Sequence, residues 1–292
     1  METNAETQVT WQPRVTALVP CFNAAEFISR TLDSLAAQTW PSLEILISDD
    51  CSSDNTFEIV SGFAKGRDNV RLVPRDQNMG WLRNSNDLMS RAGGELMFFA
   101  FHDDIVAPDY VEKLVEALRS NPQAVLSYSD VEVFQPDGSS VVLSFEGLSG
   151  PSSRLARGLG MARRPRNWWV PNRGLFRACA FHRIGGIKPN DKGEYSADWT
   201  WLLHMSLLGK FVRVPEVLCY KHVRNGSLSR QWSHDAIQMR ALRRAGIREI
   251  QESELAAIEK LILVSLITAR GAIDLLPPRA KIIIRRVLQQ FV

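Results

Sequence analysis

Acidic side chains follow two of the predicted strands at the point where each strand ends. Asp49 and Asp50 come directly after one strand, and Asp103 and Asp104 come after another. In a parallel sheet these strand ends meet at one edge, which is where ligands bind. Carboxylates gathered there repel one another unless a cation or hydrogen-bond donors are present. Because Mg²⁺ and Mn²⁺ take oxygen ligands and bridge to phosphates, the pattern indicates a cation and phosphate site.

Helix capping is the competing interpretation of these acidic residues. Ser52 and Asp54 precede a predicted helix, where their side chains would accept hydrogen bonds from its first N–H groups. Capping suits Asp103 and Asp104 less well, because Pro108 places the next helix start several residues later. A metal or substrate role is therefore favoured for that pair.

The elements that would position these residues alternate in type over the first 135 residues. Short apolar runs predict strands, and stretches with helical spacing between them predict helices. This alternation predicts an α/β fold with a mostly parallel sheet that is covered on both faces. The predicted strands are 15–19, 43–48, 70–74, 95–101 and 124–134, and the predicted helices are 24–38, 55–64, 81–91 and 110–119.

The pattern changes after residue 135. Residues 136–173 are rich in glycine and proline, which predicts a loop-rich, mobile stretch. A helix is predicted over 197–208. Residues 211–223 then indicate either two strands or one bent strand, interrupted by Pro215, and the pattern is helical from Asp235 onward.

Composition limits the possible classes of protein. The chain has 292 residues, of which 45% are hydrophobic and 23% charged. A chain of this length buries about three quarters of its surface, so it is neither disordered nor a disulfide-stapled mini-protein. The net charge of +3 is too small to indicate a nucleic-acid binder.

Cysteine usage and hydropathy suggest the compartment. The four cysteines stand singly without C-x-x-C spacing, which argues against a zinc or redox site and indicates reduced thiols in the cytoplasm. Residues 1–12 lack the features of a signal peptide. Since no uncharged apolar run approaches about 18 residues, no membrane span is expected.

Several short motifs, taken in order, resemble the family 2 glycosyltransferases of the GT-A fold. The resemblance covers about residues 14–232. The matching strings are Ala17-Leu-Val-Pro-Cys-Phe-Asn23, Gln38-Thr-Trp40, Glu44-Ile-Leu-Ile-Ser-Asp49-Asp50-Cys-Ser-Ser-Asp54, Asn78-Met-Gly80, Phe101-His-Asp103-Asp104, Ala197-Asp198-Trp199 and Tyr220-Lys-His222-Val-Arg224-Asn-Gly-Ser227-Leu-Ser229. Processive members carry a Q-x-x-R-W motif and membrane helices. This chain has only Ser229-Arg-Gln-Trp232, which favours a non-processive enzyme that transfers a single sugar. A bacterial setting is what the family's usual occurrence implies.

The resemblance implies a role for each matching residue. The donor is a nucleotide-sugar, most often a UDP-sugar, and the cofactor is Mn²⁺ or Mg²⁺. The implied donor-binding residues are Pro20, Asn23, Asp49 (nucleobase), Gly80, Arg83 and Asp103 (ribose); the implied metal ligands are Asp104 and His222, with diphosphate contact as the alternative for His222.

Asp198 is implied to be the general base that activates the acceptor hydroxyl. Capping of its own helix is the competing role, and the nearby Glu194 is the competing base, because Ala197 occupies the position where the family often has Glu. One carboxylate acting as base, with no second carboxylate as nucleophile, predicts direct displacement and inversion at the anomeric carbon.

The acceptor side is expected around a group of aromatic and basic residues. Tryptophan faces suit the apolar C–H surface of sugars, although most tryptophans are simply buried. Hydrogen-bond donors beside His222 could contact phosphate. The basic run in 154–173 either contacts an anionic acceptor, closes over the donor, or is a solvated loop. The candidate acceptor or phosphate contacts are Trp168, Trp169, Trp199, Arg224 and Ser227, and the basic run is Arg154, Arg157, Arg163, Arg164, Arg166 and Arg173.

The charge balance divides the chain in two. Residues 236–292 carry ten basic and five acidic side chains, a balance of +5, whereas residues 1–235 carry 25 and 27, a balance of −2. We therefore predict a catalytic domain over 1–235, with a donor half (14–134) and an acceptor half (135–235), and a helical extension over 236–292. Residues 279–292 form a basic amphipathic pattern, which indicates docking on the catalytic domain, self-association, or peripheral contact with the inner face of the cytoplasmic membrane.

These observations together predict an inverting, metal-dependent glycosyltransferase that adds one sugar to a glycan or lipid-linked acceptor. The alternatives are a catalytically inactive nucleotide-sugar-binding module and a sugar nucleotidyltransferase. A nucleotidyltransferase would usually show a glycine-rich basic loop after the first strand, where this chain has Pro20-Cys-Phe-Asn23. A dinucleotide oxidoreductase is disfavoured because no G-x-G-x-x-G follows a strand.

Overall fold

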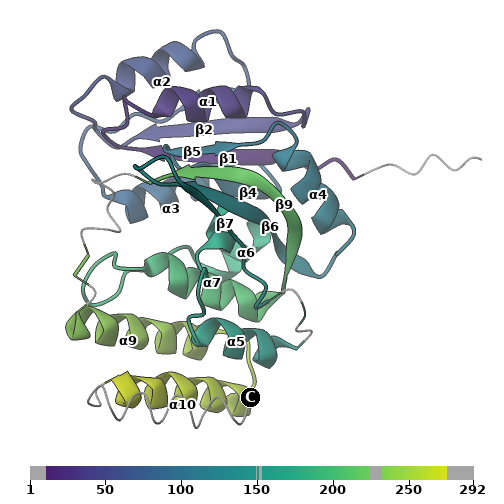
Figure 1. Cartoon of the computed structure of the whole chain (residues 1–292), viewed down its shortest axis with the longest axis vertical. Coiled ribbons are helices and arrows are strands. Elements are labelled where there is room, and N and C mark those ends of the chain that lie inside the picture. Colours follow the sequence, from purple (N-terminus) through teal and green to yellow (C-terminus); the bar gives the residue numbers. More distant parts are fainter. Residues whose placement is uncertain (1–10, 149, 151–152, 224–231, 234, 275–292) are drawn as a thin grey trace, which may run out of the picture.

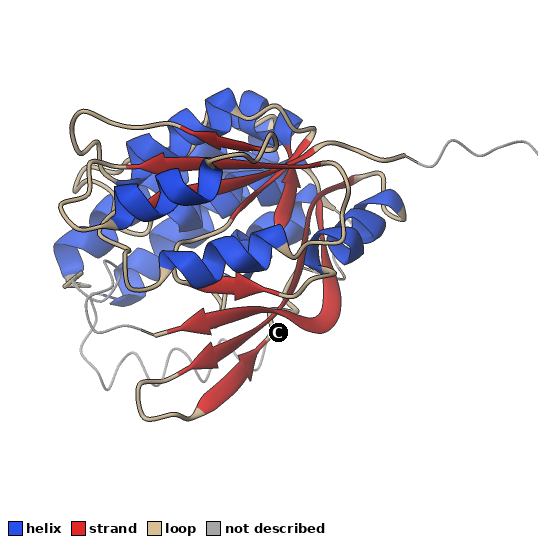
Figure 2. Cartoon of the chain, turned by 90° about the horizontal axis from the view of Figure 1, so that it is seen from above, coloured by secondary structure: helices blue, strands red, loops and turns tan. Residues whose placement is uncertain are grey.

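A single mixed sheet of nine strands forms the centre of the molecule (Figures 1 and 2). The computed structural model describes residues 11–148, 150, 153–223, 232–233 and 235–274. The strand order is β3-β2-β1-β4-β8-β6-β9-β5, with β7 paired to β6. The strands are β1 (Val15–Cys21), β2 (Leu43–Asp49), β3 (Val70–Leu72), β4 (Leu96–Phe99), β5 (Asp104–Val106), β6 (Ala124–Phe134), β7 (Ser140–Leu143), β8 (Leu175–Arg177) and β9 (Lys210–His222).

The first half of the chain builds the parallel part of this sheet. β1 pairs with β2 on one side and with β4 on the other, and β2 pairs with β3, all in parallel. These strands are apolar almost throughout because helices cover both faces of the sheet. Their carboxyl ends coincide, so that Cys21 at the end of β1 pairs with Asp49 at the end of β2. The α/β fold and its parallel sheet are thus confirmed.

Helices lie against the two faces of the sheet (Figure 1). α1, α2 and α4 cover one face, while α3 and α7 cover the other. α1 shows why these segments are helical: its buried residues Ile28, Thr31, Leu32 and Leu35 recur at helical spacing and face the core. The helices are α1 (Ile28–Ala36), α2 (Thr56–Ala64), α3 (Trp81–Arg91), α4 (Tyr110–Arg119), α5 (Arg154–Ala162), α6 (Ala178–Ile184), α7 (Ala197–Leu208), α9 (Ala236–Glu252) and α10 (Ala257–Asp274), with a 3₁₀ turn at Val170–Arg173.

The stretch 136–173 is more ordered than its composition predicts. It contains β7 and the helix α5, which begins at an N-cap where the Ser153 hydroxyl accepts a hydrogen bond from Ala156 N–H. A Cβ atom on Gly158 would lie 2.7 Å from Leu207 and 2.9 Å from Leu263. The absence of a side chain at Gly158 therefore lets α5 pack closely against α7 and α10. The prediction of a loop-rich stretch over residues 136–173 was wrong for this segment.

β9 resolves the alternative left open for residues 211–223. It is one strand of 13 residues that pairs with β6 in parallel and with β5 in antiparallel fashion. The register along β6 shifts where Val214 pairs with Ser129 and Val217 with Asp130, on either side of Pro215. Since proline cannot donate to the ladder, the strand bends at this point.

The helices α9 and α10 pack onto α7 and α5 as a further layer (Figure 1). Buried Glu249 of α9 lies 2.6 Å from His204 Nδ1 on α7 and 3.2 Å from Lys188 Nζ. None of the described helices combines the length and apolar composition needed to cross a bilayer. The amphipathic segment 279–292 lies outside the described residues, and the domain boundary at 235 stays a prediction.

Candidate active site

The loop after β2 holds Asp49 at the edge of the sheet. Asp49 accepts hydrogen bonds from Ser52, through the backbone N–H at 3.1 Å and through the hydroxyl. Asn23, in the left-handed region with φ 46°, accepts from Ser53 N–H at 2.9 Å and donates its own N–H to Ser52 Oγ. The loops after β1 and β2 thus lock together, which brings Pro20, Asn23 and Asp49 to one place as predicted from their positions in the sequence.

Negative charge is concentrated at this edge. Burial and the carboxylates of Asp49, Asp50 and Asp54 together raise the pKa of the Cys21 thiol far above its ordinary value. Asp54 accepts from the N–H of Thr56, the first residue of α2, at 3.0 Å and from Ala25 N–H at 3.1 Å, but the N-cap position of α2 is Asn55, which makes no side-chain cap hydrogen bond. Asp49 and Asp50 are both buried.

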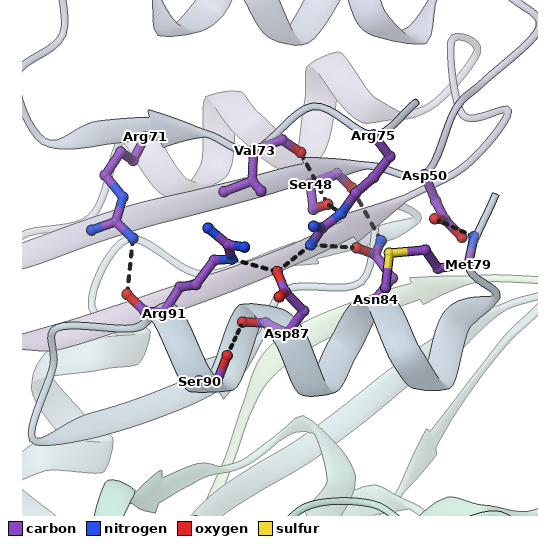
Figure 3. A network of polar contacts seen from close by, with 10 residues as sticks. All are labelled: Ser48, Asp50, Arg71, Val73, Arg75, Met79, Asn84, Asp87, Ser90 and Arg91. Atoms are coloured by element: carbon purple, nitrogen blue, oxygen red, sulfur yellow. Dashed lines mark hydrogen bonds and ion pairs between the residues drawn. The ribbon is translucent and has the colours of Figure 1, made fainter. Parts of the chain in front are cut away.

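Asp50 positions the loop before α3, a role that the sequence analysis missed. Its carboxylate accepts from Met79 N–H at 2.8 Å (Figure 3). It also accepts from Gly80 N–H at 2.9 Å. Asn78 donates to the Asp50 carbonyl at 3.1 Å. Burial raises the pKa of Asp50, whereas these backbone donors favour its charged form.

Arg75 holds α3 against the end of β2 (Figure 3). Its Nε donates to Ser48 Oγ at 3.1 Å, and its Nη2 is paired with Asp87 and lies 3.5 Å from Asn84 Oδ1. The Arg75 side chain therefore joins the end of β2 to α3. This network positions the first turn of α3, which carries the candidate donor residue Arg83.

The side chain of Glu194, which is distant in the sequence, lies against the N-terminus of α3. Its Oε1 accepts from Leu82 N–H at 3.3 Å, and a Cβ atom on Gly80 would lie 2.9 Å from the same oxygen. Burial and the nearby Asp50 raise the pKa of Glu194. Gly80 itself has φ 81°, a conformation that favours glycine. Glu194, considered above as a competing base, is thus engaged in holding the loop that contains Gly80.

Asp103 lies between β4 and β5, and Asp104 begins β5, close to the end of β1. The preceding His102 has Nδ1 3.3 Å from the Pro20 carbonyl. Asp104 pairs with Lys221 of β9, and Lys221 Nζ lies 3.6 Å from both carboxylates. Asp104 is 4% exposed and accepts at 2.8 Å from Arg173 Nε. Two cations therefore accompany the pair, which is the compensation that clustered carboxylates require.

His222 ends β9 beside these carboxylates. Its ring stacks on Phe134 at 5.0 Å between centroids, and its buried Nδ1 has no hydrogen-bond partner among the described residues. Burial, with a contribution from Arg30, lowers the pKa of His222 and keeps the imidazole neutral. Asp104 Oδ1 is likewise buried without a hydrogen bond within the described part of the chain. No three His, Cys, Asp or Glu side chains of that part form a complete metal site by themselves.

Asp198 lies in the first turn of α7 and accepts from Trp199 N–H at 3.1 Å. Burial raises the pKa of Asp198, and the charges of Arg173 and Arg164 oppose that rise. The charge of Arg173, which is bonded to Asp104, therefore also acts on Asp198. This one guanidinium couples Asp198 electrostatically to the residues after β4.

The candidate tryptophans hold arginines in place. Arg173 lies over the Trp169 ring at 4.7 Å, and Arg164 lies over Trp168 at 5.7 Å and over Trp199 at 5.3 Å. Trp199 is 1% exposed, and its indole N–H donates to the Met161 carbonyl. Arg224 and Ser227 lie outside the described residues.

Comparison with known proteins decides the family. The family model "Glycosyl transferase family 2" matches residues 16–170, more than half of the chain. The chain belongs to this family. The resemblance inferred from the sequence motifs is thereby confirmed.

Curated relatives of this family 2 chain act in polysaccharide synthesis by name. It is 28% identical over 214 residues to a chondroitin synthase of Pasteurella multocida, covering 73% of this chain and 21% of that protein. It is 30% identical over 128 residues to the putative teichuronic acid biosynthesis glycosyltransferase TuaG of Bacillus subtilis, covering 44% and 50%. The chain thus spans from about a fifth to half of the length of these relatives.

Solved structures confirm the fold of the family. S. aureus TarS 1–349 in complex with UDP-GlcNAc has a TM-score of 0.67 at 16% identity, covering 87% of this chain and 71% of that one. The mannosyltransferase PcManGT of Pyrobaculum calidifontis, in complex with GDP-Man and Mn²⁺, has a TM-score of 0.55 at 17% identity, covering 97% and 82%. The family 2 chain thus has the GT-A fold that its motifs imply.

Proposed function

We propose that this protein is an inverting glycosyltransferase that moves one sugar from a nucleotide-sugar to an acceptor hydroxyl. One observation carries the proposal: Arg173 is bonded to Asp104, and its charge also lowers the pKa of the buried Asp198 carboxyl against the effect of burial. A donor at the ends of β1, β2 and β4 would therefore present its sugar towards a carboxylate that can accept a proton. A catalytically inactive module that only binds the donor would not require the Asp198 carboxylate on the acceptor side.

The donor would bind along the acidic edge. Asp49 is held by Ser52 with its carboxylate at the end of β2, where a nucleobase N–H can donate to it. Asp103 would contact the ribose, while Gly80 and Arg83 would lie along the diphosphate. The solved neighbours contain UDP-GlcNAc and GDP-Man, which supports a nucleoside diphosphate sugar as the class of donor.

The residues beside Asp103 fit a divalent cation. Asp104 Oδ1 and the neutral His222 Nδ1 are buried atoms without a hydrogen-bond partner among the described residues, and both can ligate Mn²⁺ or Mg²⁺. The donor diphosphate would complete the coordination, since such ions commonly combine one or two protein ligands with substrate phosphates. The bound cation would stabilise charge on the departing diphosphate. Lys221, 3.6 Å from both carboxylates, balances their charge.

Asp198 would remove the proton from the acceptor hydroxyl. A half-buried carboxylate with a raised pKa is a stronger base than an exposed one, and the start of α7 favours its ionised form. As the hydroxyl oxygen bonds to the anomeric carbon, the bond to the diphosphate breaks on the opposite face. The relatives named for polysaccharide synthesis support a glycan as the acceptor. A lipid-linked form of that acceptor, at the inner face of the cytoplasmic membrane, is part of the proposal.

A nucleotide-release assay tests the proposal. Full-length protein is incubated with UDP-, GDP-, dTDP- and CMP-linked sugars, with and without Mn²⁺, and thermal shifts identify the donors that bind. Release of nucleotide from one donor, with inversion at the anomeric carbon, is the expected result. A donor that binds but is never turned over in the presence of candidate acceptors would favour the inactive module instead.

A further inference from the structure

The outer face of α10 is apolar and exposed. α10 lies furthest from the sheet, and it packs on α9 and α5 (Figure 1). Its inner side is buried, with Leu263 fully inaccessible and Ile267 only 2% exposed. On the outer side, Ile258 and Leu261 are each 62% exposed, and Ile262 is 41% exposed. Large apolar side chains that gather on one exposed face indicate that a further element packs there.

These exposed side chains belong to a regular stripe along α10. Its members recur at alternating intervals of three and one residues, so they lie on one side of the helix. All of them are exposed except Leu266, which is half-buried. We call this set the outer stripe, and it consists of Ile258, Leu261, Ile262, Ser265, Leu266 and Ala269.

The size of the outer stripe suits one helix rather than a second copy of the protein. From residue 258 to residue 269 it is about 17 Å long, and a single helix is about 10 Å wide. A stable interface between two proteins buries about 800 Å² on each partner, which is several times this area. A single helix of similar length, by contrast, would cover the stripe completely.

The charges beside the outer stripe do not favour a lipid surface. Helices that lie on membranes carry Lys and Arg along their polar side. Here Glu259 and Lys260 have opposite charges, and both are directed back to the protein. Glu259 accepts from Ala256 N–H at 3.0 Å, and Lys260 Nζ donates to the Gln251 carbonyl at 2.7 Å.

The sequence directly after α10 supplies a matching helix. Residues 275–292 lie outside the described residues, but their pattern is informative. Pro277 and Pro278 disfavour a continuation of α10 and suit the first turn of a new helix. Beyond them, apolar residues recur at the same intervals as in the outer stripe. They are Ala280, Ile283, Ile284, Val287, Leu288 and Phe291.

The lengths of the two segments fit an antiparallel pair. α10 has 18 residues and is about 27 Å long, and a helix over residues 279–292 would be about 21 Å long. The four residues 275–278 are enough to join them, because antiparallel helices are connected by two to five residues. A helix that returns from there reaches back to about Leu261. Its basic residues stand outside its apolar side, and they are Arg279, Lys281, Arg285 and Arg286.

We propose that residues 279–292 form a helix that packs in antiparallel orientation on the outer stripe of α10. The pairing buries the apolar residues of both segments and leaves the four basic side chains at the surface. α10 contacts α9 and α5, and both of these contact α7. The docked segment therefore completes the helical layer behind α7, which carries Asp198. The inference concerns the fold of the extension and does not depend on the proposed function.

Limited trypsin digestion of the full-length protein tests the docking. Cleavage at the four basic residues of the segment is followed by mass spectrometry in the wild type and in L261Q/I262Q. Glutamine suits an exposed helix, so α10 itself is kept. The matched control is V141Q/V142Q, which changes two neighbouring exposed valines of β7. Because two buried apolar contacts are lost, we expect cleavage at least about tenfold faster in L261Q/I262Q alone. Equal rates in all three proteins would overturn the proposal.

Disulfide formation tests the pairing of the two helices. In a chain whose exposed Cys51 and Cys179 are replaced by serine, S265C is combined with I284C, L288C or Q289C. Ser265 lies in the middle of the outer stripe, whereas Gln289 points away from the apolar side of its helix in the proposed arrangement. We expect an intramolecular disulfide with I284C or L288C and none with Q289C. Absence of a disulfide with both apolar positions would overturn the proposal.

The two other occupants of the outer stripe have distinct signatures. A disulfide-linked dimer of the S265C single variant would show that a second copy covers the stripe. Flotation with phosphatidylglycerol vesicles that is lost in L261Q/I262Q, without a change in trypsin cleavage, would assign the stripe to a lipid surface. Either result would overturn the proposal. Circular dichroism confirms that each variant is folded.

Discussion

Arg173 Nε donates to Asp104 Oδ2 at 2.8 Å, and the same guanidinium lies over the Phe101 ring at 4.9 Å and over the Trp169 ring at 4.7 Å. The pair is buried, with 13% of the arginine side chain and 4% of the aspartate side chain exposed. The two residues come from opposite halves of the chain, since one begins β5 and the other ends the turn before β8. The ion pair therefore ties the donor-side carboxylates to the region that carries Asp198.

Removing Arg173 should destabilise the protein strongly. In R173M the Asp104 carboxylate would stay buried, with Lys221 at 3.6 Å as its remaining cation. A buried charge that loses its main partner costs about 3 kcal/mol in the free energy of unfolding. We expect this loss in chemical denaturation of R173M, and recovery of more than half of it in R173M/D104N. A loss below about 1 kcal/mol in R173M would place the pair among weak surface ion pairs.

Replacing Gly80 by alanine should weaken donor binding through backbone strain. The residue has φ 81° and ψ 154°, a backbone region that is essentially restricted to glycine and costs other residues roughly 1–3 kcal/mol. We expect a stability loss of that size in G80A, together with a raised KM for the donor, because the loop is held by Asp50.

Two comparisons isolate the cause in G80A. Glu194 Oε1 would lie 2.9 Å from the new Cβ atom but belongs to a side chain that can move, so G80A/E194A should recover little. Gly62, within α2, has no atom within 4 Å of its Cβ position, and G62A should be neutral or stabilising. Full recovery in G80A/E194A would show that the steric contact, rather than the strain, limits the loop.

The sequence could predict the elements and the residues at strand ends because both depend on local pattern. Asp49 and Asp103 could be predicted because one ends a buried strand and the other comes a few residues after the end of another. The helix α5 was missed because Gly158 signals a loop in a sequence, whereas here it permits contact with Leu207 and Leu263, which are distant along the chain. Arg173 and Asp104 are 69 residues apart, and no periodicity indicates that they pair.

Changing Asp198 to asparagine should abolish transfer and preserve donor binding. The amide keeps the size of the side chain and can still accept from Trp199 N–H, but it cannot take a proton. Loss of a general base lowers kcat by about 10²–10⁴-fold. Nucleotide release in the presence of acceptor measures the first effect, and the thermal shift by the donor measures the second.

Glu194 provides the matched control for Asp198. In E194Q the side-chain oxygen can still accept from Leu82 N–H, so α3 keeps its start and transfer should continue at a near-normal rate. The reverse pattern, with D198N active and E194Q inactive, would contradict the assignment of Asp198 as the general base. That outcome would make Glu194 the base despite its contacts with the Gly80 loop.

The pH dependence of transfer should report the environment of Asp198. Burial raises its pKa above the ordinary value of 3.8, and only the ionised form can accept the proton. Activity should therefore fall, as the pH is lowered, at a higher pH than an exposed aspartate would produce.

The positive charges of Arg173 and Arg164 limit this rise in the pKa of Asp198. R164Q should therefore move the acidic limb of the kcat profile to a still higher pH. R166Q, which alters an exposed arginine of the same loop, should leave the limb in place. An acidic limb that R164Q does not move would assign the ionisation to a different carboxyl group, with Glu194 and Asp50 as the candidates whose pKa is also raised.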